Sequence, residues 1–310
     1  RPTGDGIGTI EYNSNLAHLY AHFVRHTIDT SLDGLTIVYD GANGAASNVG
    51  PEILSGLGAK VININVNPDG FNINDHCGST HIEGLQVAVQ QHNADLGIAN
   101  DGDADRCLLV DEKGQVLDGD QIMLLCALKL KEEGKLKDDT VVGTVMSNIG
   151  FHKAAQELGM KTFATAVGDR YVLEYMREHN LSVGGEQSGH VIFLDYNTTG
   201  DGMLTAVQVA ALMKEKNQPL SELAGIMTKY PQVLINVRVA TKTGWEDNDL
   251  IKAAIVTAEG ELGVEGRVLV RASGTEPLIR VMAEGPNQEA LQALCQEIAD
   301  IIGREQGLAD

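Results

Sequence analysis

Leu35-Thr36-Ile37-Val38-Tyr39, a run of mostly β-branched and aromatic residues, passes directly into the glycine-rich turn Asp40-Gly41-Ala42-Asn43-Gly44-Ala45. A helical stretch follows as far as Leu57, and residues 60–66 again have the composition of a strand. A strand, a helix and a second strand within about 30 residues predict a βαβ unit, in which the two strands are parallel. We therefore expect an α/β sheet to begin around residue 35.

Residues 140–166 repeat this order, with strands expected at 141–145 and 161–166, a turn at Ser147-Asn148 and a helix through Leu158. Leu57-Gly58-Ala59-Lys60 matches Leu158-Gly159-Met160-Lys161 at the same place in the second segment. Two interpretations are open. The match marks two copies of one α/β domain, or two independent helix-to-strand turns, because glycine is the usual residue just after a helix.

The last part of the chain has a different pattern. Apolar residues alternate with polar ones over residues 232–240, which is the period of a strand with one solvated face. Further strands are expected at 267–271 and 278–283, and amphipathic helices at 247–259 and 288–302. The order β-α-β-β-α predicts a smaller antiparallel α+β domain.

These patterns give an α/β protein with two tandem α/β domains of similar βαβ build, followed by the smaller antiparallel α+β domain. The expected domains are residues 1–117, 118–231 and 232–310. Tyr230-Pro231 marks the second boundary, because the residue before a proline is pushed out of helical conformation. The first boundary lies near Asp118-Gly119, just after a hairpin that closes at Asp111-Glu112-Lys113-Gly114.

The charge of the chain excludes several classes of partner. Its 310 residues include 43 acidic and 23 basic side chains, a formal net charge of −20. This charge repels nucleic-acid phosphates and anionic lipids, so we expect neither nucleic acid nor a membrane surface as a partner. No apolar stretch approaches the roughly 20 residues of a membrane span. An anionic ligand would need a locally basic pocket.

The cysteines and the first residue indicate the cellular compartment and the extent of the chain. Cysteines 77, 107, 126 and 295 stand far apart without a CxxC pair, which disfavours a zinc site or a disulfide framework and indicates a reducing cytoplasm. The sequence begins with Arg1 rather than Met. We therefore expect a piece of a longer protein.

The acidic loop (residues 101–106, Asp101-Gly102-Asp103-Ala104-Asp105-Arg106) directly follows an apolar strand expected at 95–100. Open α/β sheets place ligands at such carboxyl ends, and three closely spaced carboxylates repel one another unless a cation holds them. The loop itself offers oxygen ligands and contains no His or Cys, which indicates Mg²⁺ or Ca²⁺.

Two alternatives to a magnesium site remain for the acidic loop. An EF-hand would use Glu112 as its twelfth position, but Arg106 stands where that loop needs glycine, and strands rather than helices flank it. The other alternative is a solvated acidic turn without a metal.

The polar loop (residues 184–190, Gly184-Gly185-Glu186-Gln187-Ser188-Gly189-His190) lies between β-type runs at 181–183 and 191–194. Its carboxylate, amide, hydroxyl and imidazole groups offer the donors and acceptors that sugar hydroxyls require, and glycine lets the backbone approach a ligand. A tight hairpin with solvated side chains is the alternative.

The arginine loop (residues 271–277, Arg271-Ala272-Ser273-Gly274-Thr275-Glu276-Pro277) joins two expected strands, and Arg280 follows it. A guanidinium, two hydroxyls and exposed backbone N–H groups can bind phosphate oxygens from several directions. A turn capped by its Ser and Thr side chains is the alternative.

Three other segments carry weaker signals. The turn at residues 40–45 lacks the Gly-Lys-Ser/Thr ending of a P-loop, so ordinary strand-to-helix turning is the better interpretation. Gly168-Asp169-Arg170 either offers Arg170 to an anion or starts a helix. Residues His18, His22 and His26 have helical spacing, which favours a solvated helix face over a metal site.

The acidic, polar and arginine loops, in this order and roughly 85 residues apart, resemble the metal, sugar and phosphate loops of the α-D-phosphohexomutases. Gln187, residues 198–202 and residues 277–281 are most similar to the bacterial members that act on hexosamine phosphates. The family has four domains, and its phosphorylated serine lies in a Ser-His-Asn loop of the first. No Ser-His-Asn occurs here. The resemblance therefore implies domains two to four, without the phosphoserine domain.

The resemblance implies a double phosphoryl transfer that converts glucosamine 6-phosphate to glucosamine 1-phosphate through a hexosamine 1,6-bisphosphate. It implies Mg²⁺ as cofactor, a phosphosugar substrate, and the missing first domain of the same protein as partner; a homodimer is left open. The chain alone is expected to be inactive. Alternatives are a glucose- or mannose-phosphate mutase of the same family, or a non-catalytic module that binds metal or sugar phosphate.

By the same resemblance, each loop contributes named residues. The metal ligands are Asp101, Asp103 and Asp105. The catalytic residues are Arg106, which would support the transferred phosphate, and His190, which would transfer a proton or position the substrate. Sugar hydroxyls would be held by Glu186, Ser188 and His190. The non-reacting phosphate would be bound by Arg271, Ser273, Gly274, Thr275 and Arg280.

Overall fold

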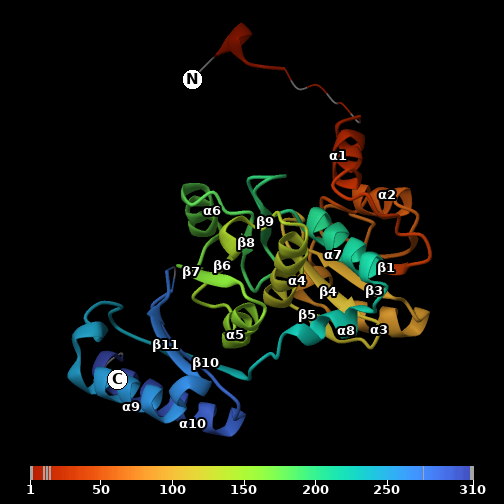
Figure 1. Ribbon diagram of the computed structural model, residues 1–310. Helices are drawn as coiled ribbons and strands as arrows, with labels where there is room; N and C mark the ends of the chain where they lie inside the picture. The colour runs from red at the N-terminus through yellow and green to blue at the C-terminus, as the bar shows by residue number, and fades with distance from the viewer. Residues whose placement is uncertain (1–2, 10, 12, 14, 275, 308–310) are drawn as a thin grey trace. The chain divides into compact units, whose positions relative to one another are not determined.

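The computed structural model describes residues 3–9, 11, 13, 15–274 and 276–307 (Figure 1). The chain forms two compact units. The first comprises Arg1–Met146 and Gly159–Ile226, and the second comprises Ser147–Leu158 and Met227–Asp310. Within the described residues, no helix is long and apolar enough to cross a membrane.

The first unit contains a five-stranded sheet in the order β2-β1-β3-β4-β5. Strand β1 pairs in parallel with both β2 and β3, whereas β4 and β5 are antiparallel. The βαβ prediction is confirmed, and so is the hairpin between β4 and β5. The elements are α1 (Asn15–Arg25), β1 (Thr36–Asp40), α2 (Val49–Gly56), β2 (Lys60–Ile64), α3 (Glu83–His92), β3 (Leu96–Asn100), β4 (Cys107–Asp111) and β5 (Val116–Leu117).

A four-stranded sheet of the first unit has the order β7-β6-β8-β9. Strand β6 pairs in parallel with β7 and β8, and β9 is antiparallel, so this sheet repeats the order and directions of β2-β1-β3-β4. Along the chain, residues 119–223 form α4 (Gly119–Glu132), β6 (Thr140–Thr144), α5 (Ile149–Glu157), β7 (Lys161–Thr165), α6 (Asp169–Glu178), β8 (Val183–Gly185), β9 (Val191–Phe193), α7 (Gly202–Lys216) and α8 (Leu220–Leu223).

The matching topologies favour two copies of one α/β domain. The glycine interpretation of the short match also holds, since Gly58 and Gly159 follow α2 and α5 with φ of +95° and +68°. The acidic loop joins β3 to β4, and the polar loop joins β8 to β9. The two loops therefore occupy equivalent positions in the two sheets.

The expected strand before the polar loop is shifted. We expected it at residues 181–183, but β8 runs over Val183–Gly185, so the loop itself is reduced to residues 186–190. A Cβ on Gly184 would lie 2.8 Å from Val142 of the neighbouring strand β6, and one on Gly185 2.2 Å from the carbonyl oxygen of His190. Close backbone approach explains these glycines as strand residues rather than loop residues.

The core of the first unit lies along the central strands and two long helices. Every residue of β3 and β6 is buried, as is typical of central strands covered on both faces. Helix α7 is buried from Gly202 to Met213 and packs against α4. A helix that is apolar around most of its circumference belongs inside a protein rather than on its surface.

The second unit contains a three-stranded antiparallel sheet in the order β10-β12-β11. This confirms the β-α-β-β-α prediction. Helices α9 and α10 and the sheet contribute residues to one hydrophobic core. This core includes Ile279, Val281 and Leu291. The elements are β10 (Gln232–Arg238), α9 (Asp249–Leu262), β11 (Arg267–Ala272), β12 (Leu278–Glu284) and α10 (Gln288–Gln306).

Helix α5 belongs to the second unit, although the sequence places it between two strands of the first. The carboxylate of Glu284, which is fully buried, accepts hydrogen bonds from Ile149 N (2.9 Å) and Asn148 Nδ2 (3.3 Å). It also accepts from Arg267 Nε (2.7 Å) and Gln232 Nε2 (2.7 Å). One buried carboxylate thus joins the start of α5 to all three strands of the sheet.

Candidate functional site

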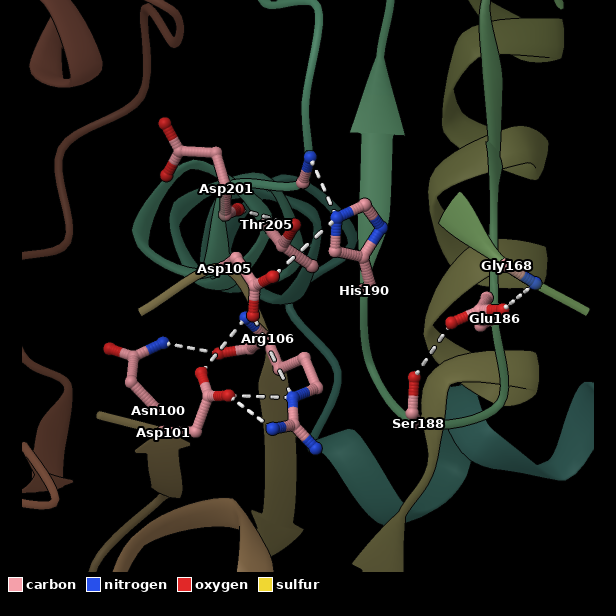
Figure 2. A network of polar contacts seen from close by, with 11 residues as sticks. Asn100, Asp101, Asp105, Arg106, Gly168, Glu186, Ser188, His190, Asp201 and Thr205 are labelled. Atoms are coloured by element: carbon pink, nitrogen blue, oxygen red, sulfur yellow. Dashed lines mark hydrogen bonds and ion pairs between the residues drawn. The ribbon is translucent and has the colours of Figure 1, made fainter. Parts of the chain in front are cut away.

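The acidic loop brings its three aspartates together. Ligand atoms of Asp101, Asp103 and Asp105 all lie within 4.8 Å of one another. Asn100, the last residue of β3, stabilises the loop by donating its Nδ2 to the carbonyl of Arg106 at 2.7 Å (Figure 2). Ala104 adopts a left-handed φ of +63°, so the chain turns sharply enough for alternate carboxylates to converge.

Arg106 neutralises one of these carboxylates. Its Nε and Nη2 each lie 2.6 Å from Asp101 Oδ2 (Figure 2). Asp105 Oδ1 is buried and makes no hydrogen bond within the described part of the chain. Burial and the charge of Asp101 raise the pKa of the Asp105 carboxyl above its usual value. An all-oxygen cluster with an unsatisfied buried carboxylate oxygen fits a hard divalent cation such as Mg²⁺.

The EF-hand alternative does not fit the structure. Strands β3 and β4 flank the acidic loop, where an EF-hand needs helices. Glu112, which would be the twelfth ligand, instead accepts hydrogen bonds from the backbone N–H and the hydroxyl of Ser221. Its carboxylate is therefore held away from the three aspartates.

The polar loop presents Glu186 and Ser188 beside a cavity of about 300 Å³, which is also lined by Thr144, Met146 and Val167. Glu186 accepts a hydrogen bond from Gly168 N at 2.9 Å, just before α6 begins (Figure 2). The Ser188 hydroxyl donates to the other Glu186 oxygen at 3.5 Å. A carboxylate and a hydroxyl thus share one small cavity, which suits recognition of vicinal hydroxyls.

His190, the last residue of the polar loop, is buried, with 4% of its surface exposed. Gly200 N donates to its Nε2 at 3.2 Å, and Asp105 Oδ2 lies 3.7 Å from the same atom (Figure 2). Because a backbone N–H can only donate, Nε2 acts as acceptor and the proton of the neutral ring lies on Nδ1. Nδ1 is buried and has no hydrogen-bond partner within the described residues.

Backbone contacts join the acidic and polar loops directly. Arg106 and His190 form an antiparallel bridge, and Cys107 N donates to Gly189 O at 3.0 Å. Gly189 has a φ of +97°, and a Cβ there would lie 2.4 Å from the carbonyl oxygen of Cys107. Gly119 N, at the start of α4, donates to Gln187 O at 2.9 Å. The two loops are one structure rather than two separate surface turns.

The arginine loop lies in the second unit. Arg271 and Arg280 stand directly opposite on β11 and β12, and Asn236 of β10 stands opposite Arg280. Burial and the charge of Arg280 lower the pKa of the Arg271 guanidinium. Two adjacent guanidiniums repel each other, and a bound anion would relieve that repulsion.

The rest of the arginine loop is partly ordered by its own contacts. Ser273 is buried, continues the ladder by donating its N–H to Leu278 O at 2.8 Å, and accepts Glu276 N on its hydroxyl at 3.3 Å. Arg280 Nη2 lies 3.3 Å from Glu276 Oε2, while its buried Nε has no partner within the described residues. A Cβ on Gly274 would meet no atom within 4 Å. Thr275 lies outside the described residues.

The weaker sequence signals resolve to ordinary structure. His18 lies 2.9 Å from Glu52, and His22 stacks on His26, so the three histidines converge on no common point. Arg170 pairs with Glu174 one turn along α6 and is exposed. Three residues that the sequence analysis did not assign to the site contact it in the structure. Asn100 donates to the carbonyl of Arg106, Gly168 N donates to Glu186, and Gly200 N donates to His190.

Comparison with known proteins places the chain in a family. The models of the phosphoglucomutase/phosphomannomutase alpha/beta/alpha domain II, alpha/beta/alpha domain III and C-terminal domain match residues 11–114, 118–230 and 234–301. The chain belongs to the phosphoglucomutase/phosphomannomutase family, and the resemblance to phosphohexomutases is confirmed.

Among the curated relatives, the chain is similar to phosphoglucosamine mutases. It is 51% identical over 308 residues to that of Geobacillus thermodenitrificans and 49% identical over 308 residues to that of Bacillus subtilis. Each match covers 99% of this chain and 69% of the relative. The Symbiobacterium thermophilum protein is 54% identical over 98% of this chain and 68% of its own length. The chain thus spans about two thirds of the length of these relatives.

Solved structures agree on the fold. A phosphoglucomutase/phosphomannomutase family protein from Burkholderia thailandensis superposes with a TM-score of 0.76 at 20% identity, covering 93% of this chain and 64% of that chain. Aspergillus fumigatus N-acetylphosphoglucosamine mutase, solved in complex with GlcNAc-6P and magnesium, gives 0.73 at 23% identity, covering 91% and 68%.

Proposed function

We propose that residues 1–310 form the metal-, sugar- and phosphate-binding parts of a phosphoglucosamine mutase. The reaction converts glucosamine 6-phosphate to glucosamine 1-phosphate through a 1,6-bisphosphate, with a phosphoserine of a preceding domain as donor and acceptor. The observation that carries this proposal is the direct joining of the acidic and polar loops through Arg106, Cys107, Gly189 and His190. The proposed metal site and the proposed sugar-hydroxyl site are therefore directly adjacent.

In this proposal Asp101, Asp103 and Asp105 hold Mg²⁺, which supplies positive charge to the phosphate being transferred. The observed fit is the convergence of three carboxylates and the unsatisfied oxygen of Asp105. Arg106, fixed on Asp101, adds a guanidinium at the edge of the same site. The magnesium complex of the Aspergillus fumigatus relative supports the choice of ion.

The other residues bind and orient the sugar phosphate. Glu186 and Ser188 hold sugar hydroxyls, and His190 transfers a proton or positions the substrate. In the second unit, Arg271, Ser273, Gly274, Thr275 and Arg280 bind the non-reacting phosphate. Binding energy from that remote phosphate can be used to order the reacting groups, which raises the rate of the chemical step.

The organisation and setting of the protein are part of the proposal. The family-model matches support three domains, at residues 1–117, 118–231 and 232–310. A 1,6-bisphosphate intermediate is supported by the Aspergillus fumigatus variant solved with glucose 1,6-bisphosphate. The four cysteines, which are buried and unpaired, agree with a cytoplasmic location.

A coupled assay for glucosamine 1-phosphate tests the proposal. We expect no turnover by residues 1–310 alone, and turnover when about 130 preceding residues with a Ser-His-Asn loop are present, the size of a typical domain. Turnover by residues 1–310 alone would contradict the need for a phosphoserine domain. If the extended protein acts on glucose or mannose phosphates only, the related mutases are the better assignment. If it turns over no sugar phosphate, the chain is a binding module.

A further inference from the structure

Lys242, in the segment after β10, reaches the arginine loop of the second unit. Its Nζ donates to two consecutive carbonyl oxygens, Ser273 O at 2.8 Å and Gly274 O at 3.2 Å. Lys242 and Ser273 are 31 positions apart, so this contact exists only in the folded unit. Within the described residues, Lys242 forms no ion pair with a carboxylate, and its ammonium group contacts these two carbonyls.

The contact sets the direction of the backbone donors. A trans peptide is planar, and its C=O and N–H groups point in opposite directions. Because Ser273 O is held toward Lys242, the N–H of Gly274, which belongs to the same peptide plane, must point away from Lys242. Gly274 has no side chain to obstruct an approaching ligand. The Lys242 ammonium group on one side of the loop therefore orients the Gly274 N–H toward the other side.

The neighbouring charges favour an anion at that donor. Arg271 and Arg280 stand side by side on the sheet, and the ladder continues to Ser273, which shares the face of Arg271 by strand alternation. The one carboxylate that contacts either guanidinium within the described residues is Glu276, on Arg280 at 3.3 Å. Oriented backbone N–H groups form the concave anion sites of phosphate-binding loops, and guanidiniums bind phosphate through charge-assisted hydrogen bonds.

We propose that Lys242 is a positioning residue for phosphate. It holds the carbonyls of Ser273 and Gly274 so that the Gly274 N–H faces the phosphate oxygens, and its charge adds to that of Arg271 and Arg280. This inference rests on the proposed role of the arginine loop in binding phosphate. A purely structural Lys242 would instead fasten the segment after β10 to the loop without affecting any ligand.

The test uses inorganic phosphate as the probe and the whole 310-residue chain labelled with [¹⁵N]glycine. The Gly274 amide signal is assigned from its absence in Gly274→Ala. We expect phosphate to shift this signal in the wild type. Lys242→Met, which keeps the aliphatic stem but loses every donor, should weaken phosphate binding by about tenfold, the effect of one charge-assisted contact. The fluorescence of the single tryptophan, Trp245, checks that the second unit remains folded.

Two further variants separate orientation from charge. Lys242→Gln is neutral but still has two N–H donors for the carbonyls, so it should keep most of the Gly274 shift. Lys252→Met, which removes an exposed charge of the same unit 3.9 Å from Asp247, is the matched control and should bind phosphate as the wild type does. If Lys242→Gln binds as weakly as Lys242→Met, charge rather than carbonyl orientation acts, and the positioning role is wrong.

Arg271→Met distinguishes failure of this inference from failure of the proposed function. If Arg271→Met abolishes phosphate binding while Lys242→Met leaves it unchanged, the phosphate site stands and Lys242 has no part in it. If the wild type shows no phosphate-dependent shift, or Arg271→Met has no effect, the arginine loop is not a phosphate site and both proposals fall.

Discussion

Replacing Glu284 with glutamine tests how the second unit is held together. Both oxygens of the buried carboxylate accept two hydrogen bonds, Oε1 from Asn148 and Gln232, and Oε2 from Ile149 N and Arg267 Nε. A glutamine amide has one acceptor and one donor group. In either orientation its NH₂ faces two donors, and Arg267 loses its charge partner.

The expected destabilisation follows from these contacts. Breaking a buried ion pair costs about 3–5 kcal/mol, and Arg267, whose side chain is 25% exposed, can recover part of this by rehydration. We therefore expect a loss of about 3 kcal/mol. For a unit of roughly 100 residues this corresponds to a fall in Tm on the order of 15 °C.

The assay is urea and thermal unfolding of the full chain, followed by the fluorescence of Trp245, which packs against the core of the second unit. Glu265→Gln is the matched control, since Glu265 is 62% exposed and pairs with Lys153 at 3.3 Å. It should cost less than about 1 kcal/mol, as exposed ion pairs do. Equal destabilisation by the two variants would refute the reasoning.

Two other predictions concern pH and glycine. Burial and the charge of Arg267 lower the pKa of His152 from 6.5 to about 4 in the folded protein. Between pH 6.5 and pH 4 the unfolded chain therefore binds a proton that the folded chain does not, and the free energy of unfolding falls as the pH decreases. At pH 5 the loss of stability, discounted for solvent screening, should be about 1.5 kcal/mol, and His152→Gln should abolish this pH dependence. The measurement is urea unfolding followed by the fluorescence of Trp245. The same unfolding midpoint for the wild type at pH 7 and pH 5 would contradict the prediction. Gly189→Ala should destabilise the first unit by a few kcal/mol, since it adds a clash with Cys107 O to the strain of a positive φ. Gly134 has a φ of +69° and open space where a Cβ would lie, so Gly134→Ala should cost only the backbone strain, about 1–2 kcal/mol. Equal unfolding temperatures of the two alanine variants in differential scanning calorimetry would rule out the clash.

Local patterns were enough to predict most of the elements. The β-branched run at residues 35–39 and the alternation at 232–240 each encode strand periodicity within a few residues, and the structure confirms both as strands. The three aspartates of the acidic loop could also be found, because their spacing is local. Their convergence depends on Ala104 and on Asn100, whose contributions no spacing rule predicts.

The parts that could not be predicted arise from contacts between distant segments. Gly168 reaches Glu186 across 18 positions, and Lys242 reaches Ser273 across 31. The membership of α5 in the second unit depends on Glu284, which lies 135 positions from Ile149. The βαβ pattern predicts the helix between its strands but says nothing about which compact unit the helix joins.

A magnesium titration of the 310-residue chain by isothermal calorimetry tests the convergence of the acidic loop most directly. We expect one ion per chain, at least tenfold weaker binding by Asp103→Asn, and unchanged binding by the control Asp75→Asn, an exposed aspartate outside the acidic loop. Equal magnesium affinity in the wild type and Asp103→Asn, or no binding by the wild type even with a hexose bisphosphate present, would contradict the site on which the proposed mutase depends.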